Sequence, residues 1–300
     1  MRTDRRLPAL LLWLCFACNM PGTNPPPEVH GHRGCRALLP ENTVPAFLKA
    51  MELGCDWLEL DVVINADGAV VVSHEPWMDP SKCLGPDGRP IDPSRERELN
   101  IYRMSTAEMR AYDCGSLDDP DHPEREKKAA VKPLLSEVVD ACDERAAEEA
   151  MPPAHFNIEI KSDPALYGTY QPAPVPFARI VMHAIDALGL ADRCIIQSFD
   201  PAVLEEVHRI EPSARIALLV DNADPLEANL ARLGFKPSIY SPAFERVDAA
   251  LVQALRARDI EMAVWTVNAA DDLRRMIDLG VDAIITDHPD RLIRMLEEEP

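Results

Sequence analysis

From Val29 onward the chain alternates short apolar segments with amphipathic ones, and this alternation restricts the fold more than any other feature. The apolar segments are bounded by turn residues, as is typical of buried parallel strands; they are Val29–Gly34, Trp57–Ile64, His155–Lys161, Cys194–Phe199, Arg215–Val220, Ser238–Ser241, Met262–Asn268 and Ala283–Thr286. The intervening segments place apolar residues at helical spacing; they are Thr43–Leu53, Leu134–Cys142, Phe177–Leu188, Ala202–Ile210, Pro225–Leu233, Val247–Arg256, Ala270–Leu279 and Arg291–Leu296.

Eight strands alternating with eight helices predict an α/β protein, namely a closed (β/α)8 TIM barrel over residues 28–300. An open doubly wound sheet is the alternative. It is disfavoured because no glycine-rich phosphate-binding loop follows the first strand.

One region interrupts this rhythm, from Pro76 to about Lys132. It is rich in Pro, Asp and charged residues, contains only short patterned pieces such as Thr106–Tyr112, and is too long for an ordinary strand-to-helix loop. We expect an insertion on the rim of the barrel, after the second strand and near the active site.

The first 27 residues have the order of an export signal followed by a linker. Arg2, Arg5 and Arg6 precede the apolar run Leu7–Cys18, which is too short to span a bilayer. We expect an exported protein, either periplasmic or anchored to a membrane through a lipidated Cys18. The alternative is an N-terminal helix packed on the barrel.

The formal net charge of −20 argues against nucleic acid as a partner, because the overall field repels phosphate. An anionic substrate would therefore need local positive groups or a bound cation.

The chain has eight cysteines, and the six beyond the export segment contain no CxxC pair, which argues against a structural zinc site. In an exported protein Cys83 could pair with Cys114, since both lie in the loop-rich region. Buried free thiols are the alternative, and the sequence does not decide between them.

Polar side chains occur in strands otherwise built for burial. The first strand ends in His30-Gly31-His32-Arg33-Gly34, which offers an acid/base group beside an anion-binding guanidinium. In the second strand Glu59 and Asp61 share one face, because strand side chains alternate. Two like charges on one buried face repel each other unless a cation or a proton lies between them.

The third strand repeats this pattern, with Asn157, Glu159 and Lys161 on one face. Three carboxylates from neighbouring strands predict a site for one divalent ion, Ca²⁺ or Mg²⁺, and a structural ion-pair network is the alternative. A turn at residues 65–68 and the apolar run after it predict a short hairpin that presents His74. That histidine would complete an acid/base pair with His32, or it is a loop residue without a role.

Taken together, these residues resemble the glycerophosphodiester phosphodiesterase family. The matching pieces follow the family's order and extend from Val29 to the C-terminus; they are HRG (His32–Gly34), PENT (Pro40–Thr43), ELD (Glu59–Asp61), VSHE (Val72–Glu75), EIK (Glu159–Lys161), QSF (Gln197–Phe199), WTVN (Trp265–Asn268) and GVDAIITDHP (Gly280–Pro289). The combination of HRG, PENT, ELD and the second histidine is specific. One departure is that many members have Asp where this chain has Glu75, which puts the support of that loop in question.

The resemblance implies a metal-dependent hydrolysis of glycerophosphodiesters to sn-glycerol 3-phosphate and an alcohol. It implies metal ligands (Glu59, Asp61, Glu159), a general acid and base (His32, His74), groups that neutralise the phosphate (Arg33, Lys161), a buttress of the His32–Arg33 loop (Glu41) and pocket walls (Gln197, Phe199, Trp265). The nucleophile is water or a neighbouring hydroxyl of the substrate, which would give a cyclic phosphate first.

Two other functions fit the same residues. One is a barrel phosphodiesterase acting on a lysophospholipid, a phosphoinositide or a sugar phosphodiester, although the charged insertion favours soluble substrates. The other is a non-catalytic protein that captures a small-molecule phosphodiester; binding alone would not require an acid/base pair. The sequence leaves the alcohol, the native metal and the oligomeric state open.

Overall fold

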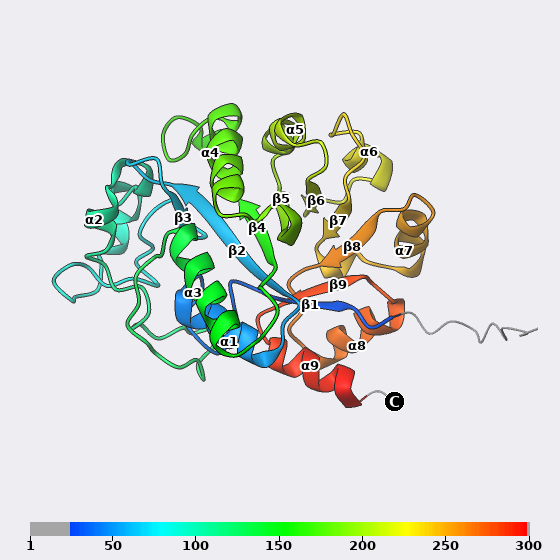
Figure 1. The fold of residues 1–300 in the computed structure, drawn as a ribbon, viewed down its shortest axis with the longest axis horizontal. Coiled ribbons are helices and arrows are strands. Elements are labelled where there is room, and N and C mark those ends of the chain that lie inside the picture. Colours follow the sequence, from blue (N-terminus) through cyan, green and yellow to red (C-terminus); the bar gives the residue numbers. More distant parts are fainter. Residues whose placement is uncertain (1–24, 299–300) are drawn as a thin grey trace, which may run out of the picture.

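A computed structural model describes residues 25–298, and the predicted export segment, including Cys18, lies almost entirely outside these residues. Eight parallel strands form a ring (Figure 1); they are β1 (Glu28–Gly31), β2 (Trp57–Ile64), β4 (Phe156–Ile160), β5 (Cys194–Ser198), β6 (Arg215–Val220), β7 (Ile239–Pro242), β8 (Glu261–Val264) and β9 (Ala283–Thr286). The ring closes because β1 pairs with both β9 and β2. The predicted TIM barrel is therefore confirmed.

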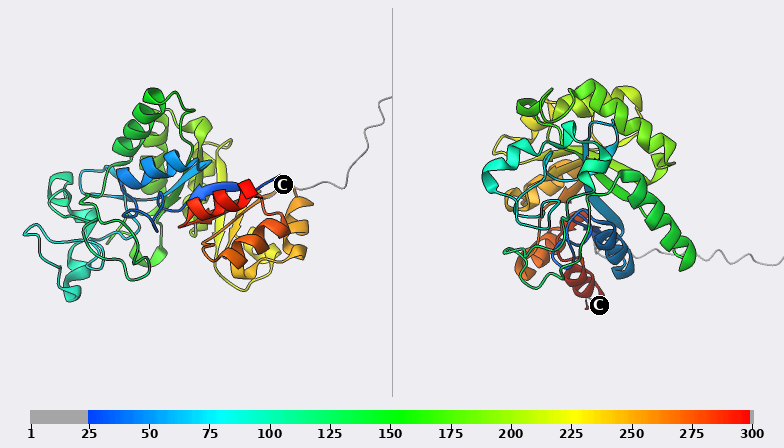
Figure 2. Two further views of the ribbon diagram at one scale, coloured as in Figure 1. Left: turned by 90° about the horizontal axis from the view of Figure 1, so that it is seen from below. Right: turned by 90° about the vertical axis from the view of Figure 1, so that its left-hand side faces the viewer.

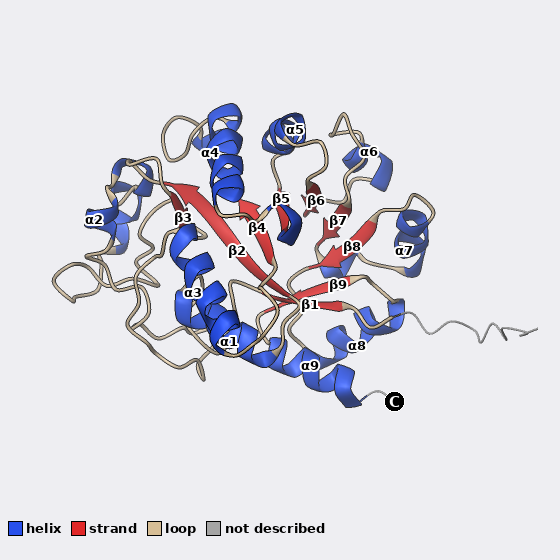
Figure 3. Ribbon diagram, in the orientation of Figure 1, coloured by secondary structure: helices blue, strands red, loops and turns tan. Residues whose placement is uncertain are grey.

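Helices surround the ring and cover its outer face (Figures 1 and 3); they are α1 (Val44–Leu53), α3 (Leu135–Glu148), α4 (Pro174–Ala187), α5 (Pro201–Ile210), α6 (Leu226–Leu230), α7 (Ala249–Arg256), α8 (Ala270–Leu279) and α9 (Pro289–Glu298). Short 3-10 turns add η3 (Pro164–Leu166), η4 (Ala191–Arg193) and η5 (Phe244–Arg246). The main core lies between strands and helices and includes Leu58 and Leu60 of β2. No helix within residues 25–298 has the length and apolar character needed to cross a membrane.

Two predicted strands end several residues earlier than expected, and both ends lie at the mouth of the barrel. β1 ends at Gly31 rather than at Gly34, because Arg33 (φ 49°) and Gly34 (φ 89°) turn the chain out of the extended conformation. β8 ends at Val264 rather than at Asn268, so Trp265 and Asn268 belong to a loop. These polar mouth loops carry side chains of the candidate site.

The interior of the barrel is apolar toward the N-terminal ends of the strands and polar toward their C-terminal ends. One buried cluster fills the lower part; it consists of Trp57, Ile195, Ala217, Ile239, Ala263 and Ala283. Side chains of a strand alternate, so Glu59 and Asp61 share the interior face with Trp57. The predicted orientation of these two carboxylates is confirmed.

The rim insertion, residues 76–132, follows β3 (Val70–Val72), a short strand antiparallel to β2, and the loop that carries His74 and Glu75. It is mostly loop (Figure 3) and stands at one end of the molecule (Figure 2), with the short elements η1 (Pro93–Glu98), η2 (Ile101–Arg103) and α2 (Thr106–Met109). It has a small apolar core against Val63 and Val71, made of Met78, Cys83, Ile101, Met109 and Cys114.

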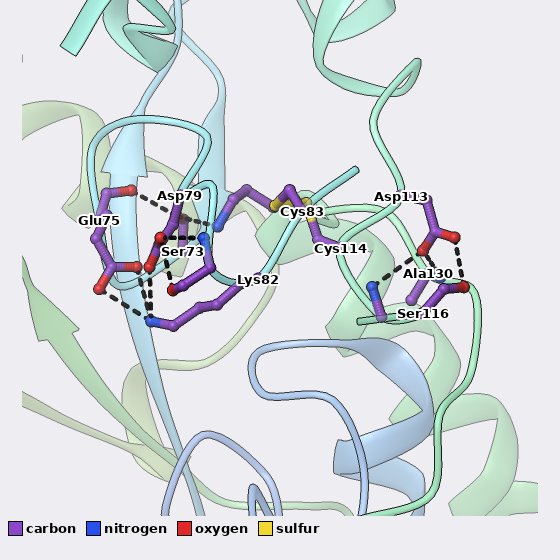
Figure 4. The surroundings of a disulfide bond; sticks show 12 residues. Ser73, Glu75, Asp79, Lys82, Cys83, Asp113, Cys114, Ser116 and Ala130 are labelled. Atoms are coloured by element: carbon purple, nitrogen blue, oxygen red, sulfur yellow. Dashed lines mark hydrogen bonds and ion pairs between the residues drawn. A yellow bond between two sulfur atoms is a disulfide. The ribbon is translucent and has the colours of Figure 1, made fainter. Parts of the chain in front are cut away.

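A disulfide joins Cys83 to Cys114 inside the insertion (Figure 4), which confirms that pairing. The other four cysteines of the described chain are free thiols; they are Cys35, Cys55, Cys142 and Cys194.

Candidate active site

The loop after β1 brings a histidine and an arginine to the barrel mouth. Gly34 permits this turn: its φ is 89°, and a Cβ there would lie 2.8 Å from backbone and side-chain atoms of Ala46. The turn directs the backbone N–H of Arg33 to Glu59 Oε2 at 2.8 Å. The loop is thereby fixed to the interior of β2.

Three buried carboxylates converge beside this loop. Glu59 and Asp61 come from β2 and Glu159 from β4, where Asp61 and Glu159 are direct neighbours in the strand pairing. One oxygen from each lies within 4.8 Å of the other two.

Cations and amides surround the three carboxylates. Lys161 Nζ donates to Glu159 Oε1 at 2.7 Å and lies 3.6 Å from Asp61 Oδ1. Arg33 Nε lies 3.3 Å from Asp61 Oδ2, to which Asn42 Nδ2 also donates at 2.8 Å. Gln197 Nε2 donates to Glu59 Oε1 at 3.0 Å. The site therefore combines negative oxygen ligands with positive groups suited to an anion.

The pKa values within the cluster move in opposite directions. Burial, reinforced by the charges of Asp61 and Glu159, raises the pKa of Glu59 well above its ordinary value. Burial also raises the pKa of Glu159, partly offset by Lys161. Burial opposes ionisation of Asp61 as well, but the charges of His74, Arg33 and Lys161 outweigh it and hold its pKa well below the usual range.

These residues fit a hard divalent cation. Carboxylate oxygens are the ligands that Ca²⁺ and Mg²⁺ prefer. Asp61 Oδ1 is buried without a hydrogen-bond partner among the described residues, and so is Gln197 Oε1. A cation at this point would satisfy the free carboxylate oxygen and neutralise the repulsion among the three acids.

Two histidines, His32 and His74, lie near the acidic cluster, and each has a carboxylate partner at Nδ1. His32 Nδ1 lies 2.5 Å from Asp287 Oδ1, and its Nε2 lies 3.9 Å from Glu59 Oε2. His74 Nδ1 lies 2.7 Å from Glu75 Oε1. A carboxylate at Nδ1 fixes the proton there and leaves Nε2 to exchange protons. Glu75 thus supports His74 despite its departure from the family pattern.

Two adjoining cavities meet at this site. The smaller, of about 160 Å³, is bordered by most of the predicted site residues; they are His32, Arg33, Glu59, His74, Glu159, Lys161, Gln197, Phe199 and Trp265. The larger, of about 510 Å³, shares His74, Glu159, Lys161 and Phe199 with it and extends between the insertion and the loop after β4. The Phe199 and Trp265 rings meet edge to face at 5.4 Å.

Glu41 lies apart from both cavities. Its carboxylate pairs with Arg33 at 2.9 Å, Arg36 at 3.1 Å and Lys82 at 2.9 Å. This environment is suited to the buttressing of the Arg33 loop that the sequence suggested.

Several residues of the site were assigned no role from the sequence. Asn42 and Asp287 stand inside the matched motifs PENT and GVDAIITDHP, which were a usable signal. Lys82 and His122 stand in the insertion, where no periodicity or motif marks them.

A closed barrel whose mouth combines clustered carboxylates with cations suited to an anion fits a hydrolase of phosphodiesters. Residues 32–291 match the glycerophosphoryl diester phosphodiesterase family. The chain belongs to this family.

Two relatives carry the name glycerophosphodiester phosphodiesterase. The protein from Caldanaerobacter subterraneus subsp. tengcongensis is 30% identical over 90% of this chain and 98% of its own length. The protein from Bacillus altitudinis is 28% identical, again over 90% of this chain and 98% of its own.

Solved structures have the same architecture. A glycerophosphoryl diester phosphodiesterase structure from Silicibacter pomeroyi superposes with a TM-score of 0.80 at 29% identity, covering 91% of this chain and 93% of that one. A phosphodiesterase from Oleispira antarctica, determined with its product sn-glycerol-3-phosphate, superposes with a TM-score of 0.71 at 19% identity, covering 91% and 98%. The latter likeness supports the fold alone.

Proposed function

We propose that this enzyme hydrolyses glycerophosphodiesters to sn-glycerol 3-phosphate and an alcohol, with His32 and His74 as general base and general acid. The observation that carries the proposal is the convergence of Glu59, Asp61 and Glu159 within 4.8 Å, beside two histidines that each have a carboxylate at Nδ1. A protein that only binds a phosphodiester would not need this acid/base pair.

Glu59, Asp61 and Glu159 would hold one Ca²⁺ or Mg²⁺ ion. The ion would supply Lewis-acid polarisation of the phosphoryl group. Arg33 and Lys161, which line the same cavity, would bind phosphate oxygens, and their positive charges compensate locally for the net negative charge of the chain.

The two histidines differ in their surroundings. Burial lowers the pKa of His32 although Asp287 opposes this, so a neutral ring is favoured, as a general base requires. His32 would accept the proton of the nucleophile, which is water or a neighbouring hydroxyl of the substrate. His74 borders both cavities and would give its proton to the departing alkoxide.

The two cavities suggest where each half of the substrate lies. The smaller cavity, with Gln197, Phe199 and Trp265 in its wall, is suited to the glycerol side. The larger cavity would receive the alcohol. Its wall includes Trp77, Leu166 and Phe199, which favours an alcohol with an apolar body over a small polar one.

We also propose that the protein is exported, either to the periplasm or as a lipoprotein tethered through Cys18. The order of the first residues suggests this, and the Cys83–Cys114 disulfide supports it, because disulfides persist in oxidising compartments. The mass of the mature protein isolated from membrane and soluble fractions tests it: cleavage and a diacyl mass on Cys18 indicate the lipoprotein, and an uncleaved N-terminus contradicts export.

The test of the activity uses the purified protein and a panel of phosphodiesters, with Ca²⁺, Mg²⁺ or EDTA. Phosphorus NMR follows the products and detects a cyclic phosphate if one forms. We expect metal-dependent release of sn-glycerol 3-phosphate. Binding without turnover, or release of the phosphate on the alcohol instead of on glycerol, would contradict the proposal.

A further inference from the structure

Lys82 of the insertion forms ion pairs with three carboxylates, one of which is the partner of His74. Its Nζ lies 3.0 Å from each carboxylate oxygen of Glu75, 2.9 Å from Glu41 and 3.4 Å from Asp79. Figure 4 shows the Lys82 side chain extended toward Glu75 and Asp79. Lys82 Nζ donates to both carboxylate oxygens of Glu75, and one of them, Oε1, is also the partner of His74 Nδ1.

The backbone at Lys82 is held from both sides. Its N–H donates to Asp79 O at 3.1 Å, and the next residue, Cys83, forms the disulfide with Cys114 (Figure 4). Leu84 N then donates to Asp113 O at 2.7 Å. The ammonium group is therefore carried by a fixed segment, which is what positioning a carboxylate requires.

His122 of the insertion holds the partner of the other histidine. Its Nε2 lies 3.3 Å from Asp287 Oδ2, and its Nδ1 lies 3.1 Å from Asp119 Oδ2. Its side chain is 8% exposed. Both ring nitrogens face carboxylate oxygens, which only accept hydrogen bonds, so the imidazolium form satisfies both contacts. The pairing with Asp287 correspondingly raises the pKa of His122.

Asp287 thus lies between two imidazoles. Its Oδ1 binds His32 Nδ1, while its Oδ2 meets His122 and accepts from Asn268 Nδ2 at 2.7 Å. Two donors on Oδ2 fix the plane of the carboxylate, and this plane sets the orientation of the His32 ring.

We propose that the rim insertion is part of the catalytic apparatus, in which Lys82 and His122 are positioning residues for the carboxylates that orient His74 and His32. The inference rests on the proposed function for the roles of the two histidines. It adds that the insertion, and not only the barrel, determines the turnover rate.

The kinetic test compares Lys82→Met with Lys82→Arg, and His122→Phe with His122→Gln. The conservative partner keeps the charge in one case and a donor to Asp287 in the other. Lys127→Met is the matched control, since Lys127 is an exposed lysine of the same insertion that pairs with Asp118.

We expect Lys82→Met and His122→Phe to lower kcat on the order of tenfold with KM within about twofold of wild type, because misorientation affects the transition state more than binding. Lys82→Arg and His122→Gln should recover most of the loss, and the control should match wild type. Because the two residues act on different histidines, their effects should multiply in the double variant. Unchanged kcat in both Met and Phe variants, or equal loss in the conservative ones, overturns the proposal.

Nitrogen-15 NMR of the histidine rings gives a readout that does not depend on turnover. His122→Phe should shift the ring signals of His32 but not those of His74, and Lys82→Met should do the reverse. If the wild-type protein hydrolyses no diester, the proposed function fails while these shifts still decide the inference. If neither variant shifts its histidine, the inference fails whatever the activity.

Discussion

Asp287 Oδ1 lies 2.5 Å from His32 Nδ1, so the residue directly after the last strand of the barrel is the partner of a histidine that follows the first strand. The carboxylate is buried, and burial alone would raise its pKa. The pairing with the imidazoles of His32 and His122, supported by Arg36, outweighs this effect and holds the pKa of Asp287 far below its usual range. The ionised carboxylate of Asp287 is therefore strongly favoured.

Asp287→Asn should lower kcat on the order of 10³-fold with little change in KM, because the amide no longer enforces the Nδ1–H tautomer of His32. Steady-state kinetics on the best diester measure the loss, and circular dichroism checks the fold. A variant that retained half of the wild-type kcat would show that this pair does not govern the base.

His32→Ala and His74→Ala should each lose most turnover, about 100-fold or more, while the fold survives. His183→Gln, an exposed histidine on α4, serves as the control. Near-normal kcat in either alanine variant would refute the role assigned to that histidine.

Removal of the divalent ion should abolish activity and lower the melting temperature, because three acids are left to repel one another. The pKa of Glu59 is raised in the folded metal-free protein, so folding opposes the ionisation of this carboxyl group. The folded state therefore loses stability as the pH rises above the unfolded pKa of Glu, near 4.3. Glu59→Gln should therefore leave the metal-free protein at pH 7 as stable as wild type, or more stable by about 1 kcal/mol.

Chemical denaturation with EDTA, and again with Ca²⁺ or Mg²⁺, measures both effects of Glu59→Gln. The variant should lose activity and gain little stability from the ion. A marked destabilisation of the metal-free variant would indicate that the acids form a structural network rather than an ion site.

His122 should make the stability of the protein depend on pH. The pKa of His122 is raised in the folded state. Its pairing with Asp119 and Asp287 therefore stabilises the folded protein fully at pH values below the unfolded pKa near 6.5. This stabilisation is lost as the pH rises through the folded pKa. Asp119 and Asp287 favour the charged ring, whereas Arg36, Arg125 and His288 lie nearby and oppose it. The free energies of unfolding of wild type and His122→Phe should therefore converge as the pH rises above about 6.5, and a constant difference would contradict this.

Leu166→Trp should narrow the larger cavity and test which half of the substrate it receives. We expect kcat/KM to fall about tenfold for a diester with a long alkyl or aryl alcohol and to change little for glycerophosphoethanolamine. An equal loss on both substrates would place the alcohol elsewhere.

The sequence predicts the repeating part of this molecule well, because burial imposes a period that can be read from a single chain. The bounds of β2, β6 and β9 agree with the prediction, and the shared face of Glu59 and Asp61 follows from the same alternation. Two strands were predicted too long, to Gly34 and to Asn268. After β1 the chain leaves the extended conformation at Arg33 and Gly34, whose φ angles are positive. After β8 the residues up to Asn268 form a loop shaped by tertiary contacts.

Apart from the Cys83–Cys114 disulfide, the contacts of the insertion could not be predicted from the sequence. Lys82 and His122 lie in loops without a hydrophobic period, and their partners are fixed by how the insertion folds back over the barrel. Charged residues in such loops are usually solvated, so nothing in their type distinguishes these two from their neighbours.

The closure of the barrel by β1 and β9 has a consequence for the assembly of the enzyme. His32 and Asp287 are 255 residues apart in the sequence. The reactive centre therefore cannot form until almost the whole chain has been synthesised and β1 has paired with β9. The rate at which activity recovers during refolding therefore reports on the pairing of β1 with β9. A chain truncated before β9 should be inert even where its earlier strands have already associated.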